Sequence, residues 1–237
     1  MEKVAGLFPV LPGKDVRNVA AVLKGRLDEY TESRRRQRVH VERAYEQVTP
    51  MGTFVISYLE TERPFAETSA ILGRSELQID RDFVRAIKDV HGFDVTQPPP
   101  GEPPELLADW VDEAVTDRKR GLAFCATVIP GASDKARPFF KEAYETRRDD
   151  LTAARRAQGM SRDLVCLNHT PMGDVLCVYF EGDDPVESNR RLAASRSDYD
   201  VWFKERCKEI FPPEIDFNEP VPPVTEIFDS ENLAVRS

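Results

Sequence analysis

The sequence predicts an α+β fold in which two βαββαβ repeats pack sheet to sheet within one chain. Three observations lead to this prediction. The tetrapeptide TPMG occurs twice, at residues 49–52 and 170–173. A shift of 121 residues superimposes these two copies, and it also superimposes identical residues on both sides of them. In each half of the chain, strand-like and helix-like hydrophobic spacings follow one another in the same order.

The match between the halves extends well beyond the tetrapeptide, which favours an internal duplication. Elsewhere the shift drifts by one to three residues, as expected if insertions collected in loops after the duplication. We therefore predict repeat one at residues 1–116 and repeat two at residues 117–237. The matched pairs include Arg34 with Arg155, Gln37 with Gln158, Tyr58 with Tyr179, Glu60 with Glu181, Asp80 with Asp200, and Phe83 with Phe203.

Each repeat opens with a strand and an amphipathic helix. The segments VAGLFPV (residues 4–10) and GLAFCATVI (residues 121–129) are rich in strand-forming residues, and each runs into a Pro-Gly turn. Apolar residues then recur at spacings of three and four, between positions 16 and 30 in one repeat and between 140 and 154 in the other. This spacing predicts one helix in each repeat.

A β-hairpin, a second helical region and a last strand complete each repeat. TPMG supplies the turn between residues 39–47 and 53–60, and again between 164–168 and 174–181. The second helical regions run from residue 64 to about 90 and from 185 to about 210, with breaks near Gly73 and Ser197. A proline-rich passage then leads to the short extended segments ELLADW and VTEIFD.

The order βαββαβ is that of the ferredoxin-like unit, an antiparallel sheet with two helices on one face. The other face of such a sheet needs a cover, and the second repeat is the obvious one. With its TPMG hairpins, its Tyr-x-Glu pairs, and DYDVWFKERCKEI from Asp198 echoed by IDRDFVRAIKDVHG from Ile79, the chain resembles the dimeric α+β barrel superfamily in a tandem form.

The resemblance implies a small-molecule protein without specifying its chemistry. Superfamily members include cofactor-independent monooxygenases, cyclase-like enzymes, haem-binding decomposers of chlorite and stress-responsive proteins. We expect an oxygenase, cyclase or isomerase acting on a mainly apolar organic substrate. The alternative is a protein that binds a ligand or a partner without catalysis. Either could be a monomer or a homodimer.

Charge and hydropathy exclude other classes. A net charge of −9 argues against nucleic-acid binding, which needs a concentrated positive field. No run of about 18 apolar residues is present, so no membrane span is expected. The N-terminus lacks the long apolar stretch of a signal peptide, which predicts a cytoplasmic protein. The four cysteines form no CxxC pair, and we expect them to be reduced and buried.

The histidines are the first candidates for chemistry. His169 stands where repeat one has Val48, so it could mark one specialised half; its other interpretation is a hairpin histidine bonded locally. His40 lies in a predicted strand on a polar face. His91, at the end of a helix, fits the helix dipole and is the weakest candidate. Any of the three could be nominated as the proximal ligand of a haem, which is the alternative, but none stands in a motif of the haem-binding members. We therefore expect no cofactor and no metal.

Aromatic residues of repeat two are candidates for the wall of a ligand cavity. Tyr144, Tyr199 and Trp202 join a large apolar surface to a polar group, and we expect them, together with His40, to bind substrate. His169 and Tyr179 are the expected catalytic pair, although Tyr179 also fits a structural pairing with Tyr58. The arginine pairs 34–35 and 155–156 fit helix C-termini better than an anion site.

Overall fold

The structure is a computed structural model that describes residues 1–97 and 102–233, and its elements follow the predicted order. Part of the proline-rich passage expected in repeat one lies outside the described residues. Repeat one contains β1 (Glu2–Pro9), α1 (Arg17–Lys24), α2 (Leu27–Gln37), β2 (Val39–Thr49), β3 (Gly52–Thr61), α3 (Phe65–Gly73), α4 (Gln78–His91) and β4 (Glu105–Val111). Repeat two contains β5 (Arg120–Thr127), α5 (Ser133–Lys141), a π-helical turn (Glu142–Thr146), α6 (Arg148–Gln158), β6 (Met160–Thr170), β7 (Gly173–Gly182), α7 (Pro185–Ala194), α8 (Asp198–Cys207) and β8 (Val224–Asp229), followed by a short 3₁₀ helix (Ser230–Asn232).

The TPMG tetrapeptides form the tips of the two hairpins, as predicted. The hydroxyl of Thr49 accepts a hydrogen bond from the Met51 amide at 3.2 Å and donates one to the Gly52 carbonyl at 2.9 Å. Gly52 has a φ of 131°, which a residue with a side chain rarely adopts. Thr170 and Gly173 repeat these features in the second hairpin, so the tetrapeptide is a turn motif in both places.

The first helix of each repeat is broken, which the apolar spacing did not predict. In repeat one the break falls at Gly25, between α1 and α2, and glycine has a low helix propensity. In repeat two a π-helical turn lies in the corresponding region and adds residues without ending the helical path. The breaks predicted near Gly73 and Ser197 are confirmed, and the hydroxyl of Ser197 caps α8 by accepting from the Asp200 amide.

The last strand of each repeat joins the sheet of the other repeat. One sheet has the order β1-β3-β2-β8 and the other β4-β6-β7-β5, with antiparallel pairing throughout. In a self-contained ferredoxin-like unit the last strand would lie beside the first. Here β8 pairs with β2, and β4 pairs with β6. A buried ion pair between Arg43 Nε and Asp229 Oδ1, at 3.0 Å, ties β8 to β2.

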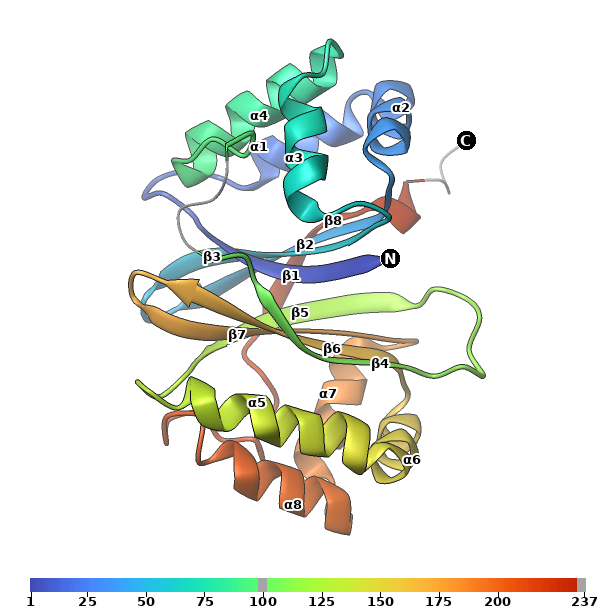
Figure 1. Cartoon of the computed structure of the whole chain (residues 1–237), viewed down its shortest axis with the longest axis vertical. Helices are drawn as coiled ribbons and strands as arrows, with labels where there is room; N and C mark the ends of the chain where they lie inside the picture. Colours follow the sequence, from blue (N-terminus) through green and yellow to red (C-terminus); the bar gives the residue numbers. More distant parts are fainter. Residues whose placement is uncertain (98–101, 234–237) are drawn as a thin grey trace. The chain divides into compact units, whose positions relative to one another are not determined.

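The chain therefore forms two compact units whose bounds differ from those of the sequence repeats. Unit 1 comprises Met1–Glu102 and Val224–Ser237, and unit 2 comprises Pro103–Pro223. The fold class is α+β: the described residues form two antiparallel four-stranded sheets and eight α-helices, consistent with tandem ferredoxin-like repeats. In Figure 1, α1–α4 cover one face of the unit 1 sheet, and α5–α8 cover one face of the unit 2 sheet.

Candidate functional site

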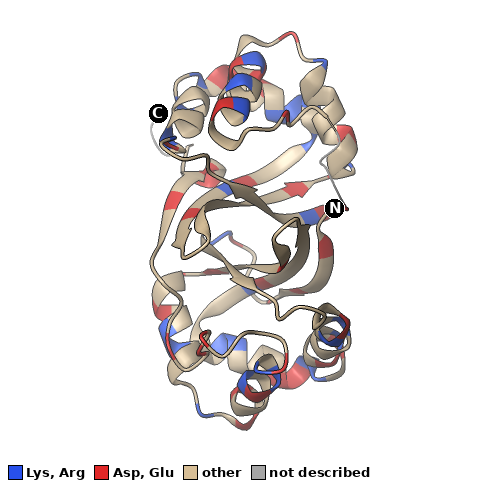
Figure 2. Cartoon of the chain, turned by 90° about the vertical axis from the view of Figure 1, so that its left-hand side faces the viewer, with Lys and Arg blue, Asp and Glu red and all other residues tan. Residues whose placement is uncertain are grey.

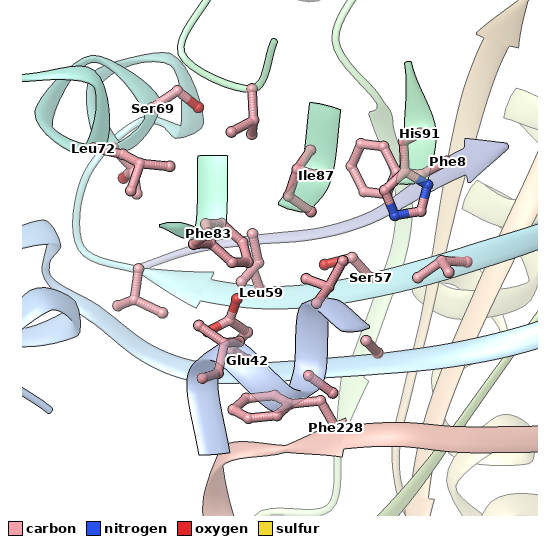
Figure 3. Close-up of a pocket in the computed structure, with 18 of the residues that line it drawn as sticks. Phe8, Glu42, Ser57, Leu59, Ser69, Leu72, Phe83, Ile87, His91 and Phe228 are labelled. Carbon is pink, nitrogen blue, oxygen red and sulfur yellow. The ribbon is translucent and has the colours of Figure 1, made fainter. Parts of the chain in front are cut away.

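A cavity of about 110 Å³ lies in unit 1, between the helices and the sheet. Figure 3 shows it with Phe8 and His91 on one side and Ser69 and Leu72 on the other. Its lining is mostly apolar, and engineered apolar cavities of roughly 150 Å³ accept benzene, so this space suits a small organic molecule. The polar residues of the lining are Arg34, Gln37, Glu42, Ser57, Thr68, Ser69 and His91.

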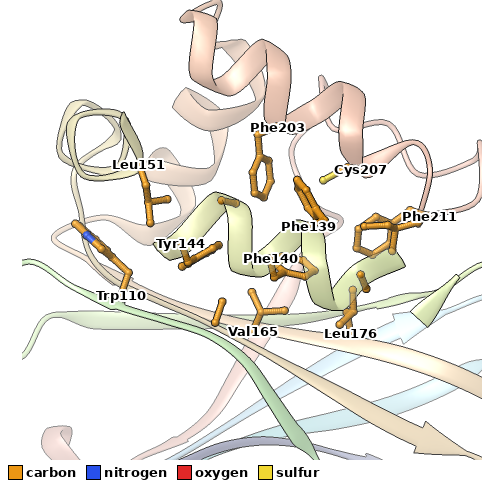
Figure 4. Close-up of a cluster of buried hydrophobic side chains, with 14 of the residues drawn as sticks. Trp110, Phe139, Phe140, Tyr144, Leu151, Val165, Leu176, Phe203, Cys207 and Phe211 are labelled. Atoms are coloured by element: carbon orange, nitrogen blue, oxygen red, sulfur yellow. The ribbon is translucent and has the colours of Figure 1, made fainter. Parts of the chain in front are cut away.

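In unit 2 a cluster of buried side chains lies between the helices and the sheet. Its core is rich in aromatic residues, and Figure 4 shows Phe139, Phe140, Tyr144 and Phe203 packed between the helices and the sheet. The ring of Phe139 lies 5.1 Å from that of Phe203, measured between centroids. The corresponding buried cluster of unit 1 is mainly aliphatic, with Tyr30 and Phe228 as its buried aromatic members. The duplicated fold thus leaves room for a ligand in unit 1.

Among the polar residues of the cavity wall, His91 has a protonation pattern that its hydrogen bond defines. It is the last residue of α4, where Gly92 takes the left-handed conformation that ends the helix. Its Nδ1 lies 2.8 Å from the carbonyl oxygen of Pro9, which can only accept a hydrogen bond. In the neutral ring Nδ1 therefore carries the proton, and Nε2 presents a lone pair. Within the described part of the chain, Nε2 has no hydrogen-bond partner.

Burial favours this neutral form. His91 is 6% exposed, and burial lowers the pKa of its imidazole below the ordinary value of 6.5, although the bond to Pro9 opposes that change. The rings of Phe8 and Phe93 lie 6.0 and 6.1 Å from the imidazole. An uncharged imidazole held by one nitrogen, with its other nitrogen a lone-pair acceptor, has the form required of a general base.

Arg34 and Glu42 form a buried ion pair at the cavity. Arg34 donates from Nε to Glu42 Oε2 at 2.7 Å and from Nη2 to Oε1 at 3.1 Å, and both side chains are almost fully buried. The hydroxyl of Tyr30 donates to Glu42 Oε2 at 3.0 Å. Burial alone would lower the pKa of Arg34, but the Glu42 charge raises it above its ordinary value. The two charges cancel, so the cavity offers no net charge to a ligand.

Unit 2 contains the same kind of network. Arg155, the counterpart of Arg34, donates from Nε to Asp163 Oδ2 at 2.6 Å, and Tyr144 donates to the same oxygen at 2.6 Å. Gln158 bridges from Arg155 to Asp200. Because the network occurs in both units, its role is structural. The helix-dipole interpretation of these two arginines missed it, since sequence spacing does not show which strand residue faces a helix end.

Three of the sequence-predicted site residues lie together in the core of unit 2. The ring of Trp202 lies 5.6 Å from that of Tyr199, and the Arg147 guanidinium lies 4.2 Å from the Trp202 ring. The Tyr199 hydroxyl donates to the Ala143 carbonyl at 3.2 Å, and that of Tyr144 to Asp163. The hydroxyl groups of the two tyrosines are thus bonded to protein atoms. A substrate-binding role for these residues stays a prediction.

The other three predicted residues lie apart from one another. His169 is at the hairpin tip, with Nδ1 2.7 Å from Asp174 Oδ1. Tyr179 stands five residues beyond Asp174 on the same strand, roughly 17 Å away at the usual rise of a strand, and donates to Glu181 at 2.7 Å. The structure therefore does not bring the expected catalytic pair together. His40 is 47% exposed and contacts Glu62.

Searches for similar proteins give two solved structures. The first, described as "Putative monooxygenase" from Fusobacterium nucleatum, is 13% identical with a TM-score of 0.49, over 94% of this chain and 89% of that one. The second, an anthrone oxidase-like protein, is 10% identical with a TM-score of 0.46, over 94% and 90% of the two chains. These values are too low to support a statement about activity. No family model and no curated protein matches the chain.

Within residues 1–97 and 102–233, neither the charged residues nor the metal-ligating side chains gather into a further candidate site. Figure 2 shows residues of both signs interspersed along the helices of each unit. In this part of the chain no three or more His, Cys, Asp or Glu residues are grouped to hold a metal ion. No helix in this part of the chain is both long enough and apolar enough to cross a membrane.

The lowered pKa of His91 predicts how stability depends on pH. The unfolded chain binds a proton at His91 near its ordinary pKa of 6.5, whereas the folded chain binds it only at lower pH. Acid therefore favours unfolding. We expect the free energy of unfolding to fall more for the native chain than for His91→Asn between about pH 7 and about pH 5, in urea titrations. Parallel falls would contradict a buried neutral His91.

Proposed function

We propose that unit 1 binds a small, uncharged, mainly apolar organic molecule in its cavity and that His91 removes a proton from a carbon atom of that molecule. The observation that carries this proposal is the buried imidazole of His91 at the wall of an apolar cavity, held by Nδ1 at the Pro9 carbonyl, with Nε2 left as an acceptor. The volume of the cavity is of the order of engineered cavities that accept benzene, and the cavity is partly open to solvent, which favours a ligand of one ring or of two small fused rings. The internal pairing of Arg34 with Glu42 favours an uncharged one.

Proton transfer to His91 Nε2 is the step common to the three reactions expected from the sequence. In an isomerase, the resulting carbanion is reprotonated at another carbon. In a cyclase, it attacks a carbonyl carbon of the same molecule, the C=O π bond breaks, and the alkoxide takes the proton from His91. In an oxygenase, dioxygen is the co-reactant: the carbanion is oxidised as a C–O bond forms, and the peroxide anion takes the proton from His91. Loss of water from that hydroperoxide leaves a carbonyl group. His91 holds and returns the proton in each case.

Hydrogen–deuterium exchange into a carbon acid tests this step without requiring the complete reaction. 2-Indanone is a suitable probe, because it has two fused rings and methylene groups made acidic by a carbonyl. In deuterated buffer we expect the chain to accelerate exchange of these methylene protons, measured by NMR. His91→Asn keeps a donor for the Pro9 carbonyl but has no imidazole lone pair, so we expect a loss of about 100-fold or more.

Two further measurements decide between catalysis and binding alone. A rise in melting temperature with 2-indanone reports binding, because a ligand selective for the folded state stabilises it. Binding with no accelerated exchange would favour the non-catalytic alternative. If His40→Asn abolished exchange and His91→Asn did not, the site would belong to the residues expected from the sequence and not to this cavity. Exchange unaffected by His91→Asn would contradict the assignment of the base.

A further inference from the structure

The register of the strands identifies which residues of unit 2 correspond to the cavity wall. Ser57 is paired with Gly6, and Val178 holds the same place opposite Phe124. Two residues further along, Leu59 lies where unit 2 has Phe180. Tyr58 and Tyr179, between these positions, each donate to the glutamate two residues on. The two strands therefore match residue by residue.

At these positions unit 2 carries larger or more apolar side chains that occupy the space above the sheet. Phe180 is fully buried in the aromatic core, and its ring meets that of Phe124 edge to face at 6.4 Å. Leu59 and Ser57 line the cavity in unit 1. A leucine in place of a phenylalanine and a serine in place of a valine leave volume that no neighbouring side chain of unit 1 fills.

The counterpart of His91 is also apolar. Val90 and Ile210 accept equivalent backbone hydrogen bonds, from the Leu11 and Ile129 amides, so the next residue after each is equivalent. That residue is His91 in unit 1 and Phe211 in unit 2. The Phe211 ring packs against Phe217, with centroids 5.0 Å apart. At these positions unit 2 thus has phenylalanine side chains in place of Leu59 and of the base.

We infer that the chain binds one ligand, in unit 1, and that Leu59 and Ser57 are its size-determining residues, an inference that rests on the proposed function. Leu59 limits the ligand to one or two rings. Unit 2 accepts no ligand because Phe180 and Val178 occupy the equivalent volume. The specificity of the chain therefore depends on the strand positions at which the two repeats have diverged.

Replacing Leu59 by a larger and by a smaller side chain tests this inference. The probes are phenol, 2-indanone and anthrone, which have one, two and three rings. Leu59→Phe copies unit 2, and we expect it to weaken 2-indanone binding by at least about tenfold. Leu59→Ala enlarges the cavity, and we expect anthrone to bind at least about tenfold more tightly relative to phenol. Isothermal titration calorimetry gives the affinities and a stoichiometry of one ligand per chain.

The control is Leu106→Phe, the same substitution at an exposed position of β4 in unit 2. Ser57→Val also narrows the cavity, with a side chain smaller than the phenylalanine of Leu59→Phe. It serves as the test if Leu59→Phe does not fold. Native affinity for 2-indanone in folded Leu59→Phe or Ser57→Val, or two ligands per native chain, would overturn the inference. If the native chain binds none of the three probes, the proposed function fails instead.

Discussion

Replacing Arg155 by methionine is expected to destabilise the chain by about 3–5 kcal/mol. Arg155 is 2% exposed, and its guanidinium lies between the buried carboxylates of Asp163 and Asp200. Methionine fills much of the same volume but leaves both carboxylates without their cation in a region of low dielectric. In a chain of this length the melting temperature should fall by roughly 10 °C, which scanning calorimetry measures.

The matched control is Arg35→Met. Arg35 is also a helical arginine paired with a glutamate, but its side chain is 71% exposed, so its ion pair with Glu32 is screened by water. We expect this variant to melt at nearly the same temperature as the native chain, because exposed ion pairs contribute little to stability. If the two variants melted within a degree or two of each other, the network in unit 2 would not be the stabilising element that its burial indicates.

The order of the strands and helices could be predicted from the sequence because each repeat served as a check on the other. The TPMG turns and the breaks near Gly73 and Ser197 are local features, set by turn chemistry and helix caps. The exchange of last strands could not be predicted in this way. The apolar residues of VTEIFD predict a strand, but they are the same whichever sheet edge the strand joins.

The candidate site was harder to predict, because a cavity is the absence of side chains and has no motif. The large aromatic side chains of repeat two are conspicuous in the sequence and were predicted to bind substrate. In the structure they belong to the hydrophobic core of unit 2. A signal was nevertheless present in the duplication. Comparison of His91 with Phe211, and of Leu59 with Phe180, shows smaller or polar residues in repeat one where repeat two has phenylalanine. Only the strand register shows that such positions share one space.

Removing residues 224–237 is expected to unfold unit 1 while unit 2 stays folded. The deletion takes away β8, whose Ile227 and Phe228 belong to the core of unit 1, and the ion-pair partner of Arg43. Loss of one buried phenylalanine side chain alone costs about 3–5 kcal/mol. Loss of the whole strand should exceed the stability of a small unit, which is commonly about 5–15 kcal/mol. Hydrogen exchange followed by mass spectrometry should show rapid exchange in peptides from β2.

The strands that lose protection from hydrogen exchange distinguish an exchange of last strands from self-contained repeats. If β8 completed the sheet of its own repeat, protection would be lost beside it in β5, and β2 would be unaffected. With the observed pairing, β6 and β7 keep all their partner strands in the truncated chain, so their peptides should stay protected. A Phe228→Ala variant should produce the same regional pattern in weaker form, because it weakens the packing of β8 on the rest of unit 1 without removing the strand.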